Sequence, residues 1–135
     1  MSMSNTTEND VLLMMLKGTD PAWRTASTLY ISLHTADPGE TGTAITNETS
    51  YGGYSRVPVI KASGWSDGGS TFSNDALIQF PQCTSGTVTL MYFGVVTTAS
   101  GAGQLLVSGQ LSSNLGVSAG IQPQFAAGDL DVTAD

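Results

Sequence analysis

The first apolar run of the chain fits a short helix. Asn5 is a favourable N-cap residue, and Glu8 follows three residues later, where a carboxylate reaches free backbone amides and complements the helix dipole. Lys17 lies in the last turn, and Gly18 is the residue type that commonly ends a helix. The pattern therefore predicts a helix over residues 6–17. Its apolar positions are contiguous rather than confined to one stripe, so the helix needs cover on both sides, from its own domain or from a neighbouring subunit.

From Thr28 onward the apolar positions alternate with a period of two, which is typical of strands. Residues 28–34 form the first predicted strand. The next, residues 54–60, contains Pro58, which cannot donate to a β-ladder and therefore indicates an edge strand or a bulge. Shorter strands are expected at residue 72 and over residues 77–80, 104–107, 110–111, 115–118, 124–125 and 130–132.

The longest predicted strand covers residues 87–96. It is apolar on both faces, and a strand covered on each side lies at the centre of a sheet. Strict alternation places Val88, Leu90 and Tyr92 on one face of this strand. It places Met91, Phe93 and Val95 on the other face.

About eight short strands, with turn signals every eight to twelve residues or so, predict a mainly β fold. We expect an antiparallel β-sandwich, jelly-roll-like, with one short N-terminal helix. The chain divides into an N-terminal arm and helix, residues 1–18, and a single β-sandwich domain, residues 19–135. Residues 36–53 keep no sustained period. A loop of about 18 residues is long for a compact domain, and such loops commonly serve a function or an interface.

Composition narrows the possible partners. Of the 135 residues, only 11% are charged, and Lys and Arg number 4 against 11 Asp and Glu, which gives a net charge of −7. Proteins that bind phosphates need clustered cations, and these four are scattered, so we expect neither nucleic acid nor a membrane as a partner. The longest apolar run, residues 11–16, is also too short to span a bilayer, which needs about 20 residues.

One motif invites a catalytic interpretation. Residues 64–68 read Gly-Trp-Ser-Asp-Gly, which matches the G-x-S-x-G nucleophile elbow, but an elbow requires a helix after it, and no helical pattern follows. The single histidine, His34, ends a predicted strand with no carboxylate set against it by spacing. We therefore expect a glycine-rich hairpin, a structural hydrogen bond from His34, and no enzyme.

The sequence also gives little support for a metal or cofactor. One cysteine and one histidine are too few for a structural zinc site, and Cys83 is expected to be a small buried hydrophobe. Asp129, Asp131 and Asp135 offer oxygen ligands of the kind calcium prefers, yet the spacing of a calcium loop is absent. We expect these carboxylates to be solvated charges on the last strand, and we predict no metal and no cofactor.

Two segments resemble a family of small tailed-bacteriophage virion proteins. They read Leu-His-Thr-Ala-Asp-Pro-Gly over residues 33–39 and Tyr-Gly-Gly-Tyr-Ser-Arg-Val over residues 51–57. Members are commonly labelled tail fibre or structural protein and are typically encoded among head and tail genes. The resemblance implies a virion location and a structural role, and it brings no catalytic residues. It covers roughly residues 10–132 and continues through Gly64-Trp65, Asn74, Phe80-Pro81 and the Gly101-Ala102-Gly103 turn.

We therefore expect a non-enzymatic virion structural protein that works by binding. The first hypothesis is a capsid decoration (cement) protein, many copies of which bind the major capsid protein and stabilise the assembled shell by mass action. The alternative is a tail-associated structural module or a glycan-binding receptor module, with tail proteins as partners. In either case we expect a homo-oligomer with cyclic symmetry, which we take to be a trimer.

The apolar helix and the long loop are expected to contact neighbouring subunits. Tyr51, within the glycine-rich part of the loop, is the aromatic residue best placed to lie outside the core. The predicted interface residues are Leu12, Leu13, Met15, Asp37, Glu40, Tyr51, Tyr54 and Arg56.

Overall fold

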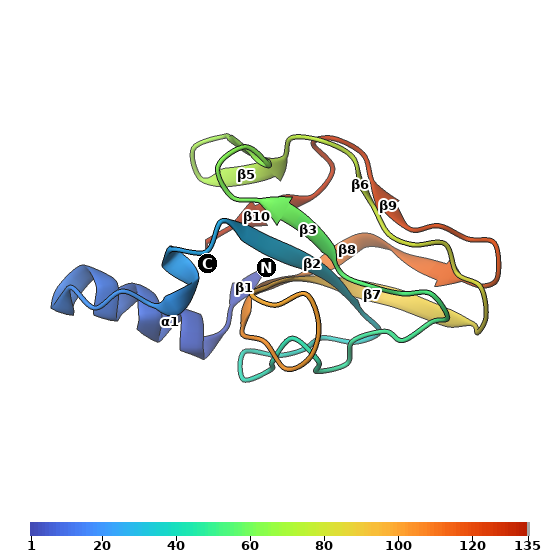
Figure 1. The fold of residues 1–135 in the computed structure, drawn as a ribbon, viewed down its shortest axis with the longest axis horizontal. Coiled ribbons are helices and arrows are strands. Elements are labelled where there is room, and N and C mark those ends of the chain that lie inside the picture. Colours follow the sequence, from blue (N-terminus) through green and yellow to red (C-terminus); the bar gives the residue numbers. More distant parts are fainter. Residues whose placement is uncertain (135) are drawn as a thin grey trace.

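The computed structural model describes residues 1–134 and is mainly β, with antiparallel strand pairing and one short N-terminal helix, as predicted (Figure 1). The longer strands are β2 (Thr28–His34), β3 (Val57–Ile60), β7 (Val88–Val96) and β8 (Leu105–Val117). The shorter strands are β1 (Ser2–Met3), β4 (Trp65–Asp67), β5 (Thr71–Asn74), β6 (Ile78–Gln79), β9 (Gln124–Phe125) and β10 (Asp131–Thr133).

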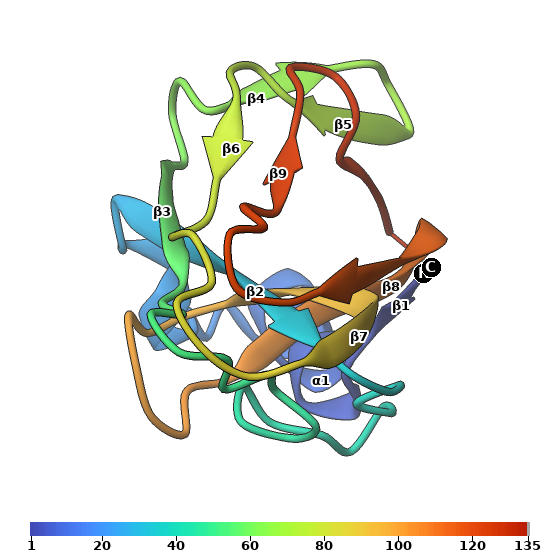
Figure 2. The same ribbon diagram turned by 90° about the vertical axis from the view of Figure 1, so that its right-hand side faces the viewer.

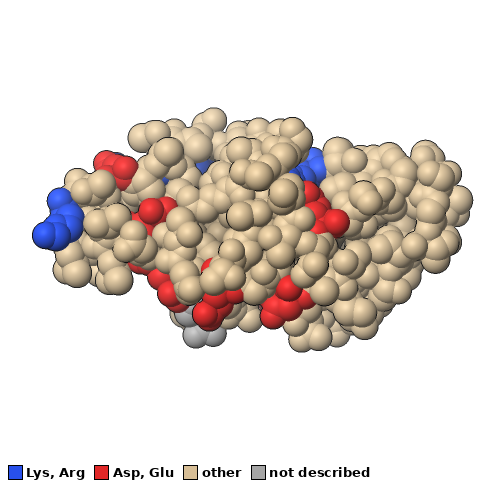
Figure 3. Space-filling model, turned by 90° about the horizontal axis from the view of Figure 1, so that it is seen from below, with Lys and Arg blue, Asp and Glu red and all other residues tan. Residues whose placement is uncertain are grey.

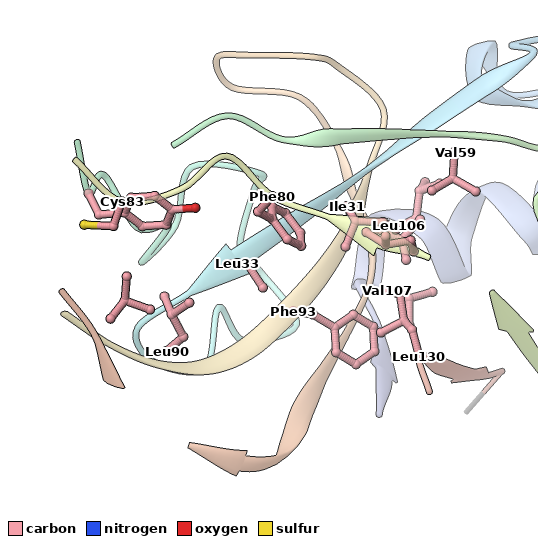
Figure 4. Close-up of a cluster of buried hydrophobic side chains, with 14 residues drawn as sticks. Ile31, Leu33, Val59, Phe80, Cys83, Leu90, Phe93, Leu106, Val107 and Leu130 are labelled. Atoms are coloured by element: carbon pink, nitrogen blue, oxygen red, sulfur yellow. The ribbon is translucent and has the colours of Figure 1, made fainter. Parts of the chain in front are cut away.

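The strands form one large sheet and two small ones. The large sheet has the order β1-β8-β7-β2-β3, and the small sheets are β10-β5-β4 and β6-β9. Figure 2 shows β4, β5, β6 and β9 as a layer opposite β2, β7 and β8. The main core fills the space between the layers, and Figure 4 shows part of it. Its labelled members are Ile31, Leu33, Val59, Phe80, Cys83, Leu90, Phe93, Leu106, Val107 and Leu130.

Two predictions about strand position are confirmed. β3, which contains Pro58, is an edge strand of the large sheet, where a missing backbone donor costs nothing. β7 lies between β8 and β2 and is therefore internal. The predicted assignment of its faces is wrong beyond Leu90, because the register of β7 shifts between Leu90 and Tyr92. The irregularity brings Leu90 and Phe93 into the same core cluster, where strict alternation would separate them.

The same irregularity explains why β8 appeared as separate pieces in the sequence. Leu90 pairs with Leu115, whereas Tyr92 pairs with Gln110. Four residues of β8, 111–114, therefore lie opposite Met91 alone, and the strand bends there. The sequence also missed β4, because this strand holds only 3 residues; with β5 it forms the hairpin expected around residues 64–69.

Helix α1 (Asn5–Leu12) continues as a π-helical turn over Leu13–Lys17, and Gly18 ends it in the left-handed conformation, with φ 65°, as predicted. The predicted N-cap is wrong by one residue. Ser4 caps the helix: its Oγ accepts a hydrogen bond from the backbone N–H of Thr7 at 3.2 Å. Ser4 is held extended because its own N–H donates to the Leu106 carbonyl at 3.1 Å, directly after β1 pairs with β8.

Gly94 in β7 is predicted to tolerate no side chain. A Cβ there would lie 2.6 Å from Ser32 Oγ and 2.9 Å from His34 Nε2, both in the packed interior. We expect Gly94→Ala to lower the free energy of unfolding by about 1–3 kcal/mol, since overpacking displaces buried neighbours. Gly116→Ala is the matched control, because a Cβ on that β8 residue meets nothing within 4 Å. Urea unfolding measures both variants, and equal stability of the two would contradict the prediction.

Candidate functional site: the helix end and the loop network

Arg56 connects the long loop to the turn that follows β7. Its Nε and Nη2 donate to the two carboxylate oxygens of Glu48 at 2.7 and 2.8 Å. Nη1 donates to the Thr98 carbonyl at 2.9 Å, and Nη2 donates to the Gly101 carbonyl at 2.8 Å. The Arg56 side chain is only 2% exposed, and its hydrogen bonds to Glu48 raise its pKa. This two-point charge pair is the kind that a guanidinium forms best, and here it ties three separate segments together.

Tyr54 extends the same network into the large sheet. Its hydroxyl donates to Glu48 Oε2 at 2.7 Å and accepts the backbone N–H of Leu33, in β2, at 3.2 Å. Burial, together with the hydrogen bond to the Glu48 carboxylate, raises the pKa of Tyr54. The phenol therefore stays protonated and continues to donate at any ordinary pH.

His34 closes the network at the end of β2. The side chain is fully buried, and its Nδ1 lies 2.8 Å from the Thr46 carbonyl, which can only accept, so Nδ1 carries the proton. Nε2 is then the acceptor for the Ser32 hydroxyl at 2.7 Å. Burial lowers the pKa of His34. A serine donating to a histidine resembles an activated nucleophile, but Ser32 and His34 are both 0% exposed, so no substrate reaches them.

Three of the predicted interface residues serve the interior of their own domain. Tyr51 is 5% exposed and lies in the main core, with its hydroxyl donating to the Pro81 carbonyl at 2.6 Å. The expectation that it lies outside the core is therefore wrong. Tyr54 packs partly buried against that core, and Arg56 is 7% exposed. Asp37 and Glu40 are exposed. Asp37 accepts a hydrogen bond from the backbone N–H of Gly39, and Glu40 accepts one from the Ser2 hydroxyl.

The helix end is the predicted interface element that stays accessible. The base of α1 is tied to the body, because Asp10 accepts hydrogen bonds from Trp23 Nε1 at 2.8 Å and from Gln104 Nε2 at 2.9 Å. Beyond Asp10 the helix extends away from the sheets (Figure 1). The predicted residues there are Leu12, 53% exposed, Met15, 69% exposed, and Leu13, which is half-buried; Leu16, which was not predicted individually, is 74% exposed.

Within residues 11–17 of the helix Lys17 is the single charged residue, and the exposed Arg24–Asp20 pair follows shortly after it. Figure 3 shows basic side chains at the protruding tip of the molecule and acidic side chains scattered over the body. Lys17 is the basic residue in the last turn of the helix. Leu12, Met15 and Leu16 add exposed apolar surface to this tip, beside the exposed Gly18 and Thr19.

The other chemical candidates fall in ordinary surroundings. Ser66 lies in the β4–β5 hairpin and donates to Asp75 Oδ1 at 2.7 Å, and a strand follows where a nucleophile elbow needs a helix. Cys83 is 1% exposed, as predicted for a buried hydrophobe. Asp129 and Asp131 are exposed, and Asp135 lies outside the described residues. Within residues 1–134, no three His, Cys, Asp or Glu side chains are grouped to hold a metal ion.

No helix within residues 1–134 has the length and apolar character needed to cross a bilayer. The fold and the network together define a small antiparallel β protein whose buried polar side chains hold its long loop in place. The family model described as "Podophage GP4 fiber I protein gp80" matches residues 2–133, so the chain belongs to this family of phage fibre structural proteins. No curated protein matches the chain.

Arg56→Met is predicted to be strongly destabilising. It leaves the mostly buried Glu48 carboxylate without its partner, and breaking a buried pair in this way costs about 3–5 kcal/mol. Arg24→Met is the matched control, because the Arg24–Asp20 pair is exposed and such pairs contribute about 0–1 kcal/mol. Chemical unfolding measures both. Similar losses in the two variants would show that the Glu48–Arg56 pair does not hold the loop.

Stability is predicted to fall with acidity through His34. Its folded-state pKa is lowered, so below the unfolded value of about 6.5 the unfolded chain binds a proton that the folded protein does not. Titration of His34 should leave the free energy of unfolding unchanged above a pH of about 6.5. Below that pH it should lower the free energy of unfolding. Urea unfolding from pH 8 to pH 5 measures the slope. His34→Gln should show a smaller slope; an unchanged slope would assign the effect to other groups.

Proposed function

We propose that the chain is a non-enzymatic structural module of the phage tail and fibre apparatus, fixed to a neighbouring virion protein by the exposed end of its N-terminal helix. The observation that carries this proposal is the position of Leu12, Met15 and Leu16, which are 53%, 69% and 74% exposed at the end of a helix that is tied down only at its base. The name of the family, a fibre protein, supports a tail location over the capsid location expected first.

The chemistry of the body fits a passive role. The polar groups that a catalytic site would use, His34 and Arg56 among them, are buried and satisfied by neighbours in the same chain. They stabilise the long loop, and they are closed to a substrate. The two most exposed of the large apolar side chains, Leu16 and Met15, in contrast lie at the helix end, where their removal from water favours association.

The magnitude of this attraction limits how the helix end can act. Complete burial of one large apolar side chain contributes about 1.5–3 kcal/mol, so three partly exposed ones supply roughly 3–6 kcal/mol. Association costs about 4–15 kcal/mol in lost freedom. The helix end is therefore a central contact that needs a surrounding polar rim, or several copies acting together in a homo-oligomer. A cyclic trimer, as expected from the sequence, is one arrangement that would provide this.

The double variant Met15→Gln/Leu16→Gln is predicted to lose incorporation into particles. Glutamine is a good helix former, so the change removes apolar surface and leaves the helix in place. We expect at least a tenfold decrease in the amount of protein per purified particle, measured by quantitative mass spectrometry after complementation of a phage that lacks the gene. Ile45→Gln is the matched control, because Ile45 is also 53% exposed but lies in the long loop.

Two outcomes would count against the proposal. If the double variant is incorporated normally and its thermal stability is unchanged, the helix end is not the contact with the neighbouring protein. Averaged images of particles carrying a labelled copy should place the protein at the tail, in a small copy number. Hundreds of copies spread over the head would instead support the capsid decoration hypothesis.

A further inference from the structure

The bend in β8 opens a pocket of about 680 Å³ in the side of the domain. Residues 111–114 have no partners in β7, and the segment that follows β9 crosses opposite them. The volume falls in the range of about 300–1,000 Å³ that is typical of small-molecule sites. The pocket lies apart from the helix end, since its lining comes from Met1, β2, β7, β8 and the C-terminal segment and includes no residue of α1.

The floor of this pocket is apolar and rigid. Leu90, Phe93 and Leu130 are core residues that are at most 4% exposed, and they form its base. Phe125 is half-buried beside them, with its ring 6.3 Å from that of Phe93 in an edge-to-face arrangement. Because the ring is held by the core, it presents a fixed aromatic surface to anything that enters.

The rim carries short polar side chains and two carboxylates. The rim residues are all exposed: Gln110, Ser112, Ser113, Gln124, Asp129 and Asp131. Asp131 already accepts a hydrogen bond from Ser73 at 2.6 Å, and Gln124 contacts Gln79 at 3.4 Å. The rim thus offers amide and hydroxyl donors together with carboxylate acceptors, around an apolar base.

We propose that this pocket binds a neutral saccharide. A sugar ring combines apolar C–H faces, which suit the Phe125 surface, with hydroxyls that can donate to Asp129 and accept from Gln110 and Ser113. An anionic ligand is disfavoured, because none of the residues 1–134 that line the pocket is Lys, Arg or His and the chain carries a net charge of −7. The inference goes beyond the proposed structural role and does not depend on the helix end.

The test uses the full-length protein labelled with ¹⁵N and a panel of probes at millimolar concentration. One arm contains methyl glycosides of glucose, galactose, mannose, rhamnose and N-acetylglucosamine. A second arm contains the polysaccharides dextran, mannan and galactan. Comparison of the two arms shows whether the ligand is a single sugar or a polysaccharide chain. Sialic acid and glucosamine are the anionic and cationic counterparts. We expect at least one neutral probe to shift the amide signals of residues 109–115 and 124–131.

Variants then locate the site. Ser113→Trp fills the pocket from an exposed position and is expected to abolish the shifts, while Asp129→Ala and Gln110→Ala weaken binding at least tenfold. Gln122→Ala is the control, because Gln122 is exposed close by but does not line the pocket. The proposal is overturned if no neutral probe shifts these signals, if sialic acid or glucosamine alone binds, or if Ser113→Trp binds normally. Met15→Gln/Leu16→Gln should bind the sugar as the parent does, so a failure of helix docking is distinguishable from a failure of this site.

Discussion

The pairing of Glu48 with Arg56 is the constraint on which the arrangement of this protein depends. Between β2 and β3 the chain has no regular strand, so the sheet does not fix the conformation of the loop. Taking two charges out of water costs several kcal/mol each, and the cost is offset only when geometry and further hydrogen bonds are good. Arg56 meets that condition through Glu48, Thr98 and Gly101, and the loop and the β7–β8 turn are fixed in the process.

Much of the sheet could be predicted because its signals are local. Pro58 requires a position without a ladder partner, so it indicated an edge, and the apolar run of residues 87–96 indicated a central strand. The face of the sheet on which each side chain of that strand lies could not be predicted. It depends on how many residues of β8 lie opposite Met91, a relation between two segments that the pattern of neither segment contains alone.

The candidate site divides in the same way. The contiguous apolar residues of the helix, a property of one segment, predicted a need for cover but not whether it comes from the same domain; the exposure of Leu12, Met15 and Leu16 is known from the structure. Tyr51 was misplaced because its hydroxyl bonds to Pro81, 30 residues away, and its burial depends on that distant partner. The pocket beside Phe125 had no sequence signal, since its lining comes from several strands and short polar residues that are individually unremarkable. The two segments that carry the family resemblance hold His34, Tyr54 and Arg56, and in this chain these residues fix the long loop.

The bend in β8 also bears on how this protein behaves at high concentration. β1 covers only two residues of β8, so the outer side of residues 109–117 has no strand beside it among the described residues. A flat, open border of that length would invite another polypeptide to extend the sheet, which is the first step of amyloid-like polymerisation. The irregular stretch at residues 111–114 interrupts the regular spacing of donors and acceptors, and thereby makes this border a poor template for a further strand.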